Sequence, residues 1–177
     1  MGFLSGFLKR DDNANADGEF LYRAMLGQSR QTGFFGPGKT PDSYEGRIEI
    51  LTLHLSIVMQ RLGALGDQGK ILSQAVFDAM VDDFDIALRE EGLTDSGVKR
   101  RIKPIVQLFY TRLRKYDDLF LREDGQGEDG VFSSGAFEQS ETEFLSRLQS
   151  YTLQLKRNLL SLGVGEIAKA KIDFPKI

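Results

Sequence analysis

The sequence predicts an all-α protein, and three observations support this fold class. Five segments carry apolar residues at the three- and four-residue spacings that are typical of amphipathic or buried helices. Stretches rich in glycine and proline separate several of these segments. No stretch shows the alternating pattern and tight turn of a strand hairpin. We therefore expect a single compact domain of about five to seven helices around a buried central helix.

The five helices expected are at 19–30, 47–62, 71–91, 98–120 and 141–162. The 47–62 segment is apolar on nearly every face, which indicates that other helices enclose it. Pro104 in the fourth segment either begins a helix at its first turn or kinks one that is already running. Residues 124–140 include four glycines and predict a flexible connection, in which Phe132 and Phe137 form or cover an exposed apolar groove.

The N-terminal 17 residues are predicted as a tail, and residues 18–177 as one helical domain. Residues 11–18 are polar, and Lys9 and Arg10 follow the first apolar residues, whereas a secretory signal begins with bases. Four apolar residues would form a small face if this segment were helical, so peripheral membrane contact is one hypothesis for the tail. These residues are Phe3, Leu4, Phe7 and Leu8.

Composition limits the classes of function. The chain has 177 residues, of which 41% are hydrophobic and 28% are charged, with a net charge of -3. This charge argues against general nucleic-acid binding, and we expect no DNA partner. The chain has no cysteine, which excludes disulfides, thiolate metal sites and cysteine nucleophiles.

Charge is separated into two blocks of opposite sign. Six acids and one base lie between Asp78 and Glu91, and seven bases with no acid lie between Ser96 and Tyr116. Fields of one sign steer and orient partners, so this pattern favours docking over catalysis. The helical spacing places four residues on one ridge, which is a solvated or ion-paired face, a docking ridge, or a ridge that pairs with the basic helix. These residues are Asp78, Asp82, Asp85 and Arg89.

The basic block predicts a second surface. If the helix continues through Pro104, one face carries Lys99, Lys103, Gln107, Tyr110 and Arg114. Such a face is either an ordinary solvated surface or a binding site for RNA phosphates or anionic lipid headgroups. The corresponding hypothesis is an adaptor that binds a ribosome or membrane surface through this helix.

His54 is the chain's one histidine. Arg47 and Arg61 lie seven residues to either side of it, and neighbouring bases would favour the neutral ring. We interpret His54 as a residue at the edge of the core with a satisfied ring nitrogen, because no nucleophile motif accompanies it. A helical enzyme with a carboxylate metal site is a weaker hypothesis, since helical di-iron sites need several Glu-x-x-His ligands. We expect no cofactor and no metal.

A set of residues in order along the chain resembles the ubiquinol-cytochrome c chaperone family. The resemblance spans positions 20 to 120. The matching residues are Pro41, Asp42, Ser43, Gly46, Arg47, Leu53, His54, Arg61, Leu62, Gln74, Phe77, Asp78, Asp85, Leu88, Arg89, Glu90, Gly92, Asp95, Val98, Phe109, Tyr110, Arg112 and Tyr116.

This resemblance implies a helical assembly factor of the cytochrome bc1 complex that is not an enzyme. Its implied partners are newly made cytochrome b and other bc1 subunits, with contact to the ribosome surface as in mitochondrial members. Acids at positions 11, 12 and 17 are unlike a transit peptide, so we expect a bacterial member in the cytoplasm, peripheral at the inner membrane. The candidate partner-binding residues are Arg47, His54, Asp78, Asp82, Asp85, Arg89, Lys99, Arg100, Lys103, Tyr110, Arg112 and Tyr116.

Overall fold

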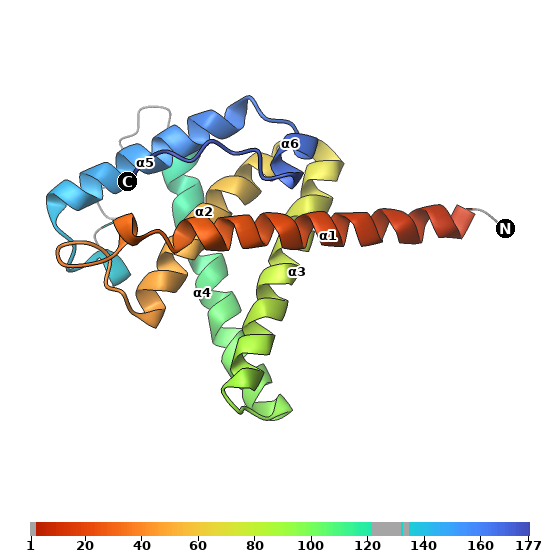
Figure 1. Ribbon diagram of the computed structural model, residues 1–177, viewed down its shortest axis with the longest axis horizontal. Helices are drawn as coiled ribbons and strands as arrows, with labels where there is room; N and C mark the ends of the chain where they lie inside the picture. Colours follow the sequence, from red (N-terminus) through yellow and green to blue (C-terminus); the bar gives the residue numbers. More distant parts are fainter. Residues whose placement is uncertain (1–2, 122–131, 133–134) are drawn as a thin grey trace.

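The computed structural model describes residues 3–121, 132 and 135–177, with side chains described from residue 13 onward except for 117–121. The described chain forms six α-helices, two short 3-10 helices and no strand, which confirms the predicted all-α class (Figure 1). The α-helices are α1 (Phe3–Ser29), α2 (Tyr44–Gly63), α3 (Gly66–Glu90), α4 (Asp95–Leu121), α5 (Thr142–Leu160) and α6 (Val164–Ala168), and the 3-10 helices are η1 (Thr32–Phe34) and η2 (Gly135–Phe137).

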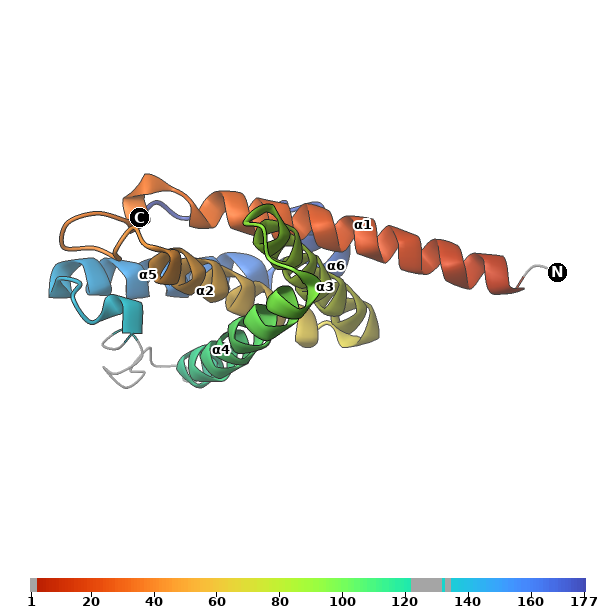
Figure 2. The same cartoon turned by 90° about the horizontal axis from the view of Figure 1, so that it is seen from below.

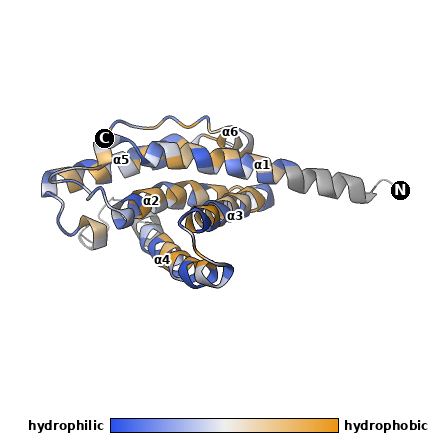
Figure 3. Cartoon of the chain, turned by 60° about the horizontal axis from the view of Figure 1, so that its bottom comes forward, coloured by the Kyte–Doolittle hydropathy of each residue, from blue (hydrophilic) through white to orange (hydrophobic). Residues whose placement is uncertain are grey.

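Helix α2 is the central helix that its all-round apolar sequence predicts. Figures 2 and 3 both place it between α1 and α4, and it also contacts α3 and α5. Residues 48–58 are all buried, including Glu49 and His54. The helix begins as expected, because the Ser43 side chain accepts a hydrogen bond from the Gly46 N–H at 3.2 Å.

Helix α1 is longer than its sequence suggests. It begins at Phe3 and continues through residues 11–18, where composition predicted a polar tail. Its N-terminal part extends past the other helices, whereas its C-terminal part crosses the body of the protein (Figures 1 and 2). Leu21 and Met25 are fully buried, so apolar contacts anchor the second half of α1 in the core.

The crossing of α1 over α3 is close because a glycine lies at the contact. A Cβ atom added at Gly18 would lie 2.5 Å from the Ala75 Cβ and 2.7 Å from the Ala75 carbonyl carbon. Backbone atoms of α3 therefore occupy the space that any larger residue at position 18 needs.

Helix α4 runs without interruption through Pro104, so no helix begins at this residue. Proline has no N–H, so it cannot bond the carbonyl of Arg100. Both residues are exposed, and water can satisfy that carbonyl. The turn before α4 is made by Gly92, whose φ of +86° is a conformation that glycine adopts at little cost.

The chain after α4 closes the core. The connection expected over 124–140 lies largely outside the described residues. Phe132 and Phe137 are buried, with ring centroids 5.5 Å apart, so these side chains do not line an exposed groove. That they cover one stays a prediction. Helix α5 buries Phe144 and Leu148 against the core, as its predicted stripe requires. Every helix of the described ranges is too short or too polar to span a bilayer.

Two alanine substitutions in α1 test the close crossing. We expect Gly18→Ala to lower the free energy of unfolding by about 1–3 kcal/mol, because α1 and α3 must separate. We expect Gly27→Ala to raise it by up to about 1 kcal/mol, since nothing lies within 4 Å of a Cβ there. Urea denaturation measures both values. Equal effects of the two substitutions would show that the crossing is not tight.

Candidate partner-binding surfaces

The acidic ridge predicted on α3 divides into two parts. Asp85 is paired with Arg89, which also donates a hydrogen bond to Asp95 in the first turn of α4. Hydrogen bonds with these two carboxylates raise the pKa of Arg89 and tie the two helices together. Asp78 and Asp82 are exposed, and neither has a cationic partner in the described part of the chain. Only these two ridge acids remain available to a partner.

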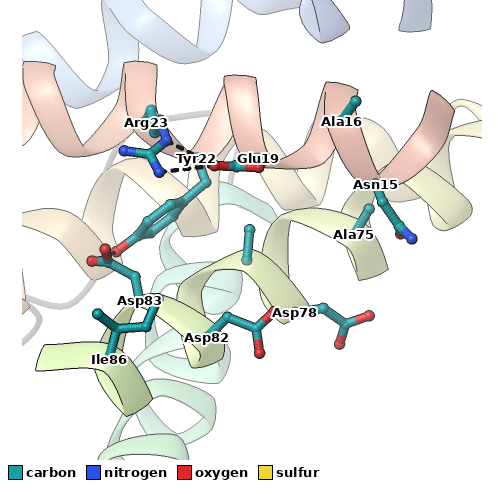
Figure 4. Close-up of a pocket in the computed structure, with 11 residues that line it drawn as sticks. Asn15, Ala16, Glu19, Tyr22, Arg23, Ala75, Asp78, Asp82, Asp83 and Ile86 are labelled. Atoms are coloured by element: carbon teal, nitrogen blue, oxygen red, sulfur yellow. Dashed lines mark hydrogen bonds and ion pairs between the residues drawn. The ribbon is translucent and has the colours of Figure 1, made fainter. Parts of the chain in front are cut away.

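A groove of about 540 Å³ lies between α1 and α3, and we call it the acidic groove (Figure 4). Four carboxylates and one guanidinium line it, from Glu19, Asp78, Asp82, Asp83 and Arg23. Arg23 is paired with Glu19 at 2.8 Å on the same helix. The other three carboxylates therefore leave the groove negatively charged.

Tyr22 and Asp83 join the two walls of the acidic groove. The Tyr22 hydroxyl, on α1, donates a hydrogen bond to Asp83 Oδ2, on α3, at 2.8 Å (Figure 4). Burial and this hydrogen bond raise the pKa of Tyr22, so the phenol stays protonated and continues to donate at physiological pH.

A smaller pocket of about 180 Å³ adjoins the acidic groove and shares Tyr22 and Asp83 with it. We call it the apolar pocket. It lies between α1, α2 and α3, and its other lining combines seven apolar residues with Ser29, Arg30, Arg47 and Glu91. The apolar lining residues are Leu26, Tyr44, Ile48, Leu51, Phe84, Ala87 and Leu88. Arg47, a candidate from the sequence, lies at its rim, with Nε donating to Asp42 Oδ1 at 2.7 Å.

The basic surface predicted on α4 is present. Lys99, Arg100 and Lys103 are exposed, and because α4 is continuous, Lys99 and Lys103 follow one side of it at helical spacing. Arg114 is also exposed farther along the helix. This side of α4 is an open, positively charged surface.

The other candidates on α4 take part in packing. Tyr110 is 46% exposed, and its ring centroid lies 5.4 Å from that of Phe77 on α3. Tyr116 is fully buried and donates a hydrogen bond to Glu49 Oε1 at 2.5 Å. Arg112 Nε lies 2.9 Å from Glu49 Oε2. Burial and the Glu49 charge raise the pKa of Tyr116. Arg112 and Tyr116 thus satisfy a buried carboxylate of α2.

His54 is also in the core. Its Nδ1 lies 2.8 Å from the Ile50 carbonyl, which only accepts, so Nδ1 carries the proton. Nε2 then accepts from the Tyr151 hydroxyl at 2.7 Å, and that hydroxyl accepts from Gln28 Nε2 at 3.2 Å. Burial lowers the pKa of His54 to about 4. The neutral ring was predicted correctly, but its cause is burial rather than neighbouring arginines.

The described residues contain no group of three or more His, Cys, Asp or Glu side chains that could hold a metal ion. Asp85, one of the three ridge acids, is engaged by Arg89. The hypothesis of a metal-dependent enzyme therefore has no ligand set within this part of the chain.

The α1 wall of the acidic groove was not predicted from the sequence. Glu19, Tyr22 and Arg23 belong to no charge block, and Tyr22 is 61 positions from Asp83. Asp83 lies beside the predicted ridge, so the acidic block was the sequence feature that could have indicated the α3 wall of this groove.

Comparison with known proteins identifies similar chains. The model of a family described as ubiquinol-cytochrome C chaperone matches residues 38–172. This match begins after α1 and extends well past position 120, where the resemblance noted from the sequence ended. A crystal structure of the Cbp3 homolog from Brucella abortus has a TM-score of 0.73 and 25% sequence identity, covering 98% of this chain and 96% of that one. No curated protein matches.

The pKa of His54 gives a prediction for stability against pH. The unfolded ring titrates near 6.5 and the folded ring near 4, so the unfolded state binds more protons between these values. Stability is therefore complete above pH 6.5 and falls by about 3 kcal/mol as the pH drops toward 4. Because the chain has one histidine, an NMR titration of its ring signals gives the folded pKa of His54 without assignment. Urea denaturation at several pH values measures the change in stability, and a His54→Gln control removes the part of that change that comes from His54. A folded pKa near 6.5 would contradict the buried geometry.

Proposed function

Because the chain belongs to the ubiquinol-cytochrome c chaperone family, we propose that it is a non-enzymatic assembly chaperone that binds newly made cytochrome b and supports assembly of the cytochrome bc1 complex. The observation that carries this proposal is the family match over residues 38–172, which includes all of α2, α3, α4 and α5. The similarity to the Cbp3 homolog extends over nearly the whole chain and supports the same conclusion.

The surface supports a binding function. An assembly chaperone needs exposed apolar area that a client can cover, and charge that selects the client without locking it in place. The apolar pocket and the exposed side chains of Tyr44 and Ile86, each 55% exposed, supply such area beside the acidic groove.

We further propose that the protein acts in the bacterial cytoplasm, peripheral at the inner membrane, where an apolar client is handed on.

Deletion of the gene tests this function. We expect membranes of the deletion strain to lose the haem b absorption of the bc1 complex, because its subunit is left without a chaperone. The absorption of an unrelated membrane haem enzyme serves as the internal control, and the intact gene restores the lost band. Normal bc1 assembly in the deletion strain would refute the function.

A second function is favoured by one specific observation, the exposed basic side of α4. We propose as the alternative that the protein is an adaptor that attaches to a ribosome or an anionic membrane through Lys99, Arg100 and Lys103. Such attachment depends on counterion release or lipid charge, and it weakens as salt rises.

Charge reversal separates the two functions. Under the adaptor hypothesis, we expect replacement of Lys99, Arg100 and Lys103 by Glu to abolish salt-sensitive co-sedimentation with ribosomes or anionic vesicles. Under the chaperone hypothesis, we expect crosslinks to cytochrome b to persist in the same variant. Lys169, Lys171 and Lys176, which are exposed near the C-terminus, provide a control with the same change in charge. If both triple variants co-sediment like the unmodified protein, α4 is an ordinary solvated surface.

A further inference from the structure

We propose that the acidic groove and the apolar pocket together form the docking site for an amphipathic, positively charged segment of the client. This inference rests on the proposed chaperone function and names the part of the client that is bound. Apolar side chains of the segment enter the apolar pocket, and its Lys or Arg side chains meet the carboxylates of the acidic groove.

The two cavities lie one after the other on a path beside α3. They share Tyr22 and Asp83, whose hydrogen bond links the helices that flank them. The lining residues on α3 run from Ala75 to Glu91, and at 1.5 Å per residue this path is about 24 Å long. It can therefore accommodate about four turns of a bound helix.

Charge determines which occupant fits. Asp78 and Asp82 line the acidic groove without a cationic partner in the described part of the chain, whereas Asp83 also interacts electrostatically with Arg23. Asp78 accepts a hydrogen bond from Gln74 and Asp83 accepts one from Tyr22, and these neutral donors orient both carboxylates. The groove keeps a net negative charge, because its described lining has four carboxylates and one guanidinium. A basic segment supplies the missing countercharge, whereas an acidic segment would be repelled.

Apolar contact completes the recognition. Ile86 is 55% exposed and lines the acidic groove, so an apolar residue stands among the carboxylates. Ala79, a small and half-buried residue, lies in the same wall, where a side chain of a bound helix can approach. The site therefore has the two properties of a helix-binding groove, which are an apolar floor and a charged rim.

A membrane subunit before insertion offers this combination. Its spanning helices are apolar, and the loops that stay on the cytoplasmic side are enriched in Lys and Arg close to the helix ends. The end of such a helix places apolar side chains next to bases. A groove with apolar and acidic parts in succession matches this order and fixes the direction of the bound segment.

Model peptides test the site directly. The probe is a fluorescent 18-residue helix-forming peptide with Leu on one face and Lys on the other, and its partner peptide carries Glu in place of each Lys. We expect the Lys peptide to bind with an affinity that falls as salt rises, and the Glu peptide to bind at least tenfold more weakly. Fluorescence anisotropy measures both affinities.

Variants of α3 locate the binding. We expect Asp78→Asn with Asp82→Asn to weaken the Lys peptide about tenfold, and Ile86→Ser to weaken both peptides. The charge control is Glu90→Gln with Glu143→Gln, which removes two exposed acids that line neither cavity. The apolar control is Ile71→Ser, because Ile71 is on the same helix, 47% exposed and outside both cavities.

Several results would overturn the inference. Equal binding of the two peptides would do so, as would control variants that weaken binding as much as the groove variants. If sedimentation velocity shows self-association that Asp82→Asn abolishes, a second copy occupies the groove instead.

If the groove variants restore bc1 assembly fully in the deletion strain, the client docks elsewhere, although the chaperone function stands. Loss of peptide binding in these variants, with normal bc1 assembly in the deletion strain, would uphold the groove and refute the function.

Discussion

The enclosure of α2 is the constraint on which the rest of the structure depends. Residues 48–58 of α2 are all buried, so each polar group that they carry must find a partner inside the protein. Glu49 meets Tyr116 and Arg112 of α4, and His54 meets Tyr151 of α5. These contacts set the register of α4 and α5 against α2, which apolar packing alone specifies less strictly.

Interior and surface have separate roles in this protein. The polar residues of the core are neutral or compensated, as the lowered pKa of His54 and the raised pKa of Tyr116 indicate. The surface keeps acids on α3 and bases on α4 that have no such compensation, while the Asp85, Arg89 and Asp95 contacts tie together the ends of the helices that carry them. A rigid interior thereby presents two fields of opposite sign in a constant arrangement, which suits the orientation of a charged partner.

Much of the fold was predictable from local pattern. The apolar residues on all sides of 47–62 indicated the central helix, and the stripes of 71–91 and 141–162 indicated the helices that cover it. The N-terminal half of α1 was missed because residues 11–18 lack an apolar stripe. Of the candidate site, the exposed acids and bases were predictable from spacing. The burial of His54 and Tyr116 was not, because their partners, Tyr151 and Glu49, are 97 and 67 positions away.

Gly18 acts as a spacer for the groove beside it. The distance between α1 and α3 is limited by what stands at this crossing, and here nothing larger than a hydrogen atom fits against Ala75. Gly18 therefore limits the width of the acidic groove that a bound helix would enter, although Gly18 itself does not line this groove. A change in side-chain volume at position 18 alters the separation of α1 and α3. The groove can therefore be adapted to bound segments of different diameter without any change in the residues that line it.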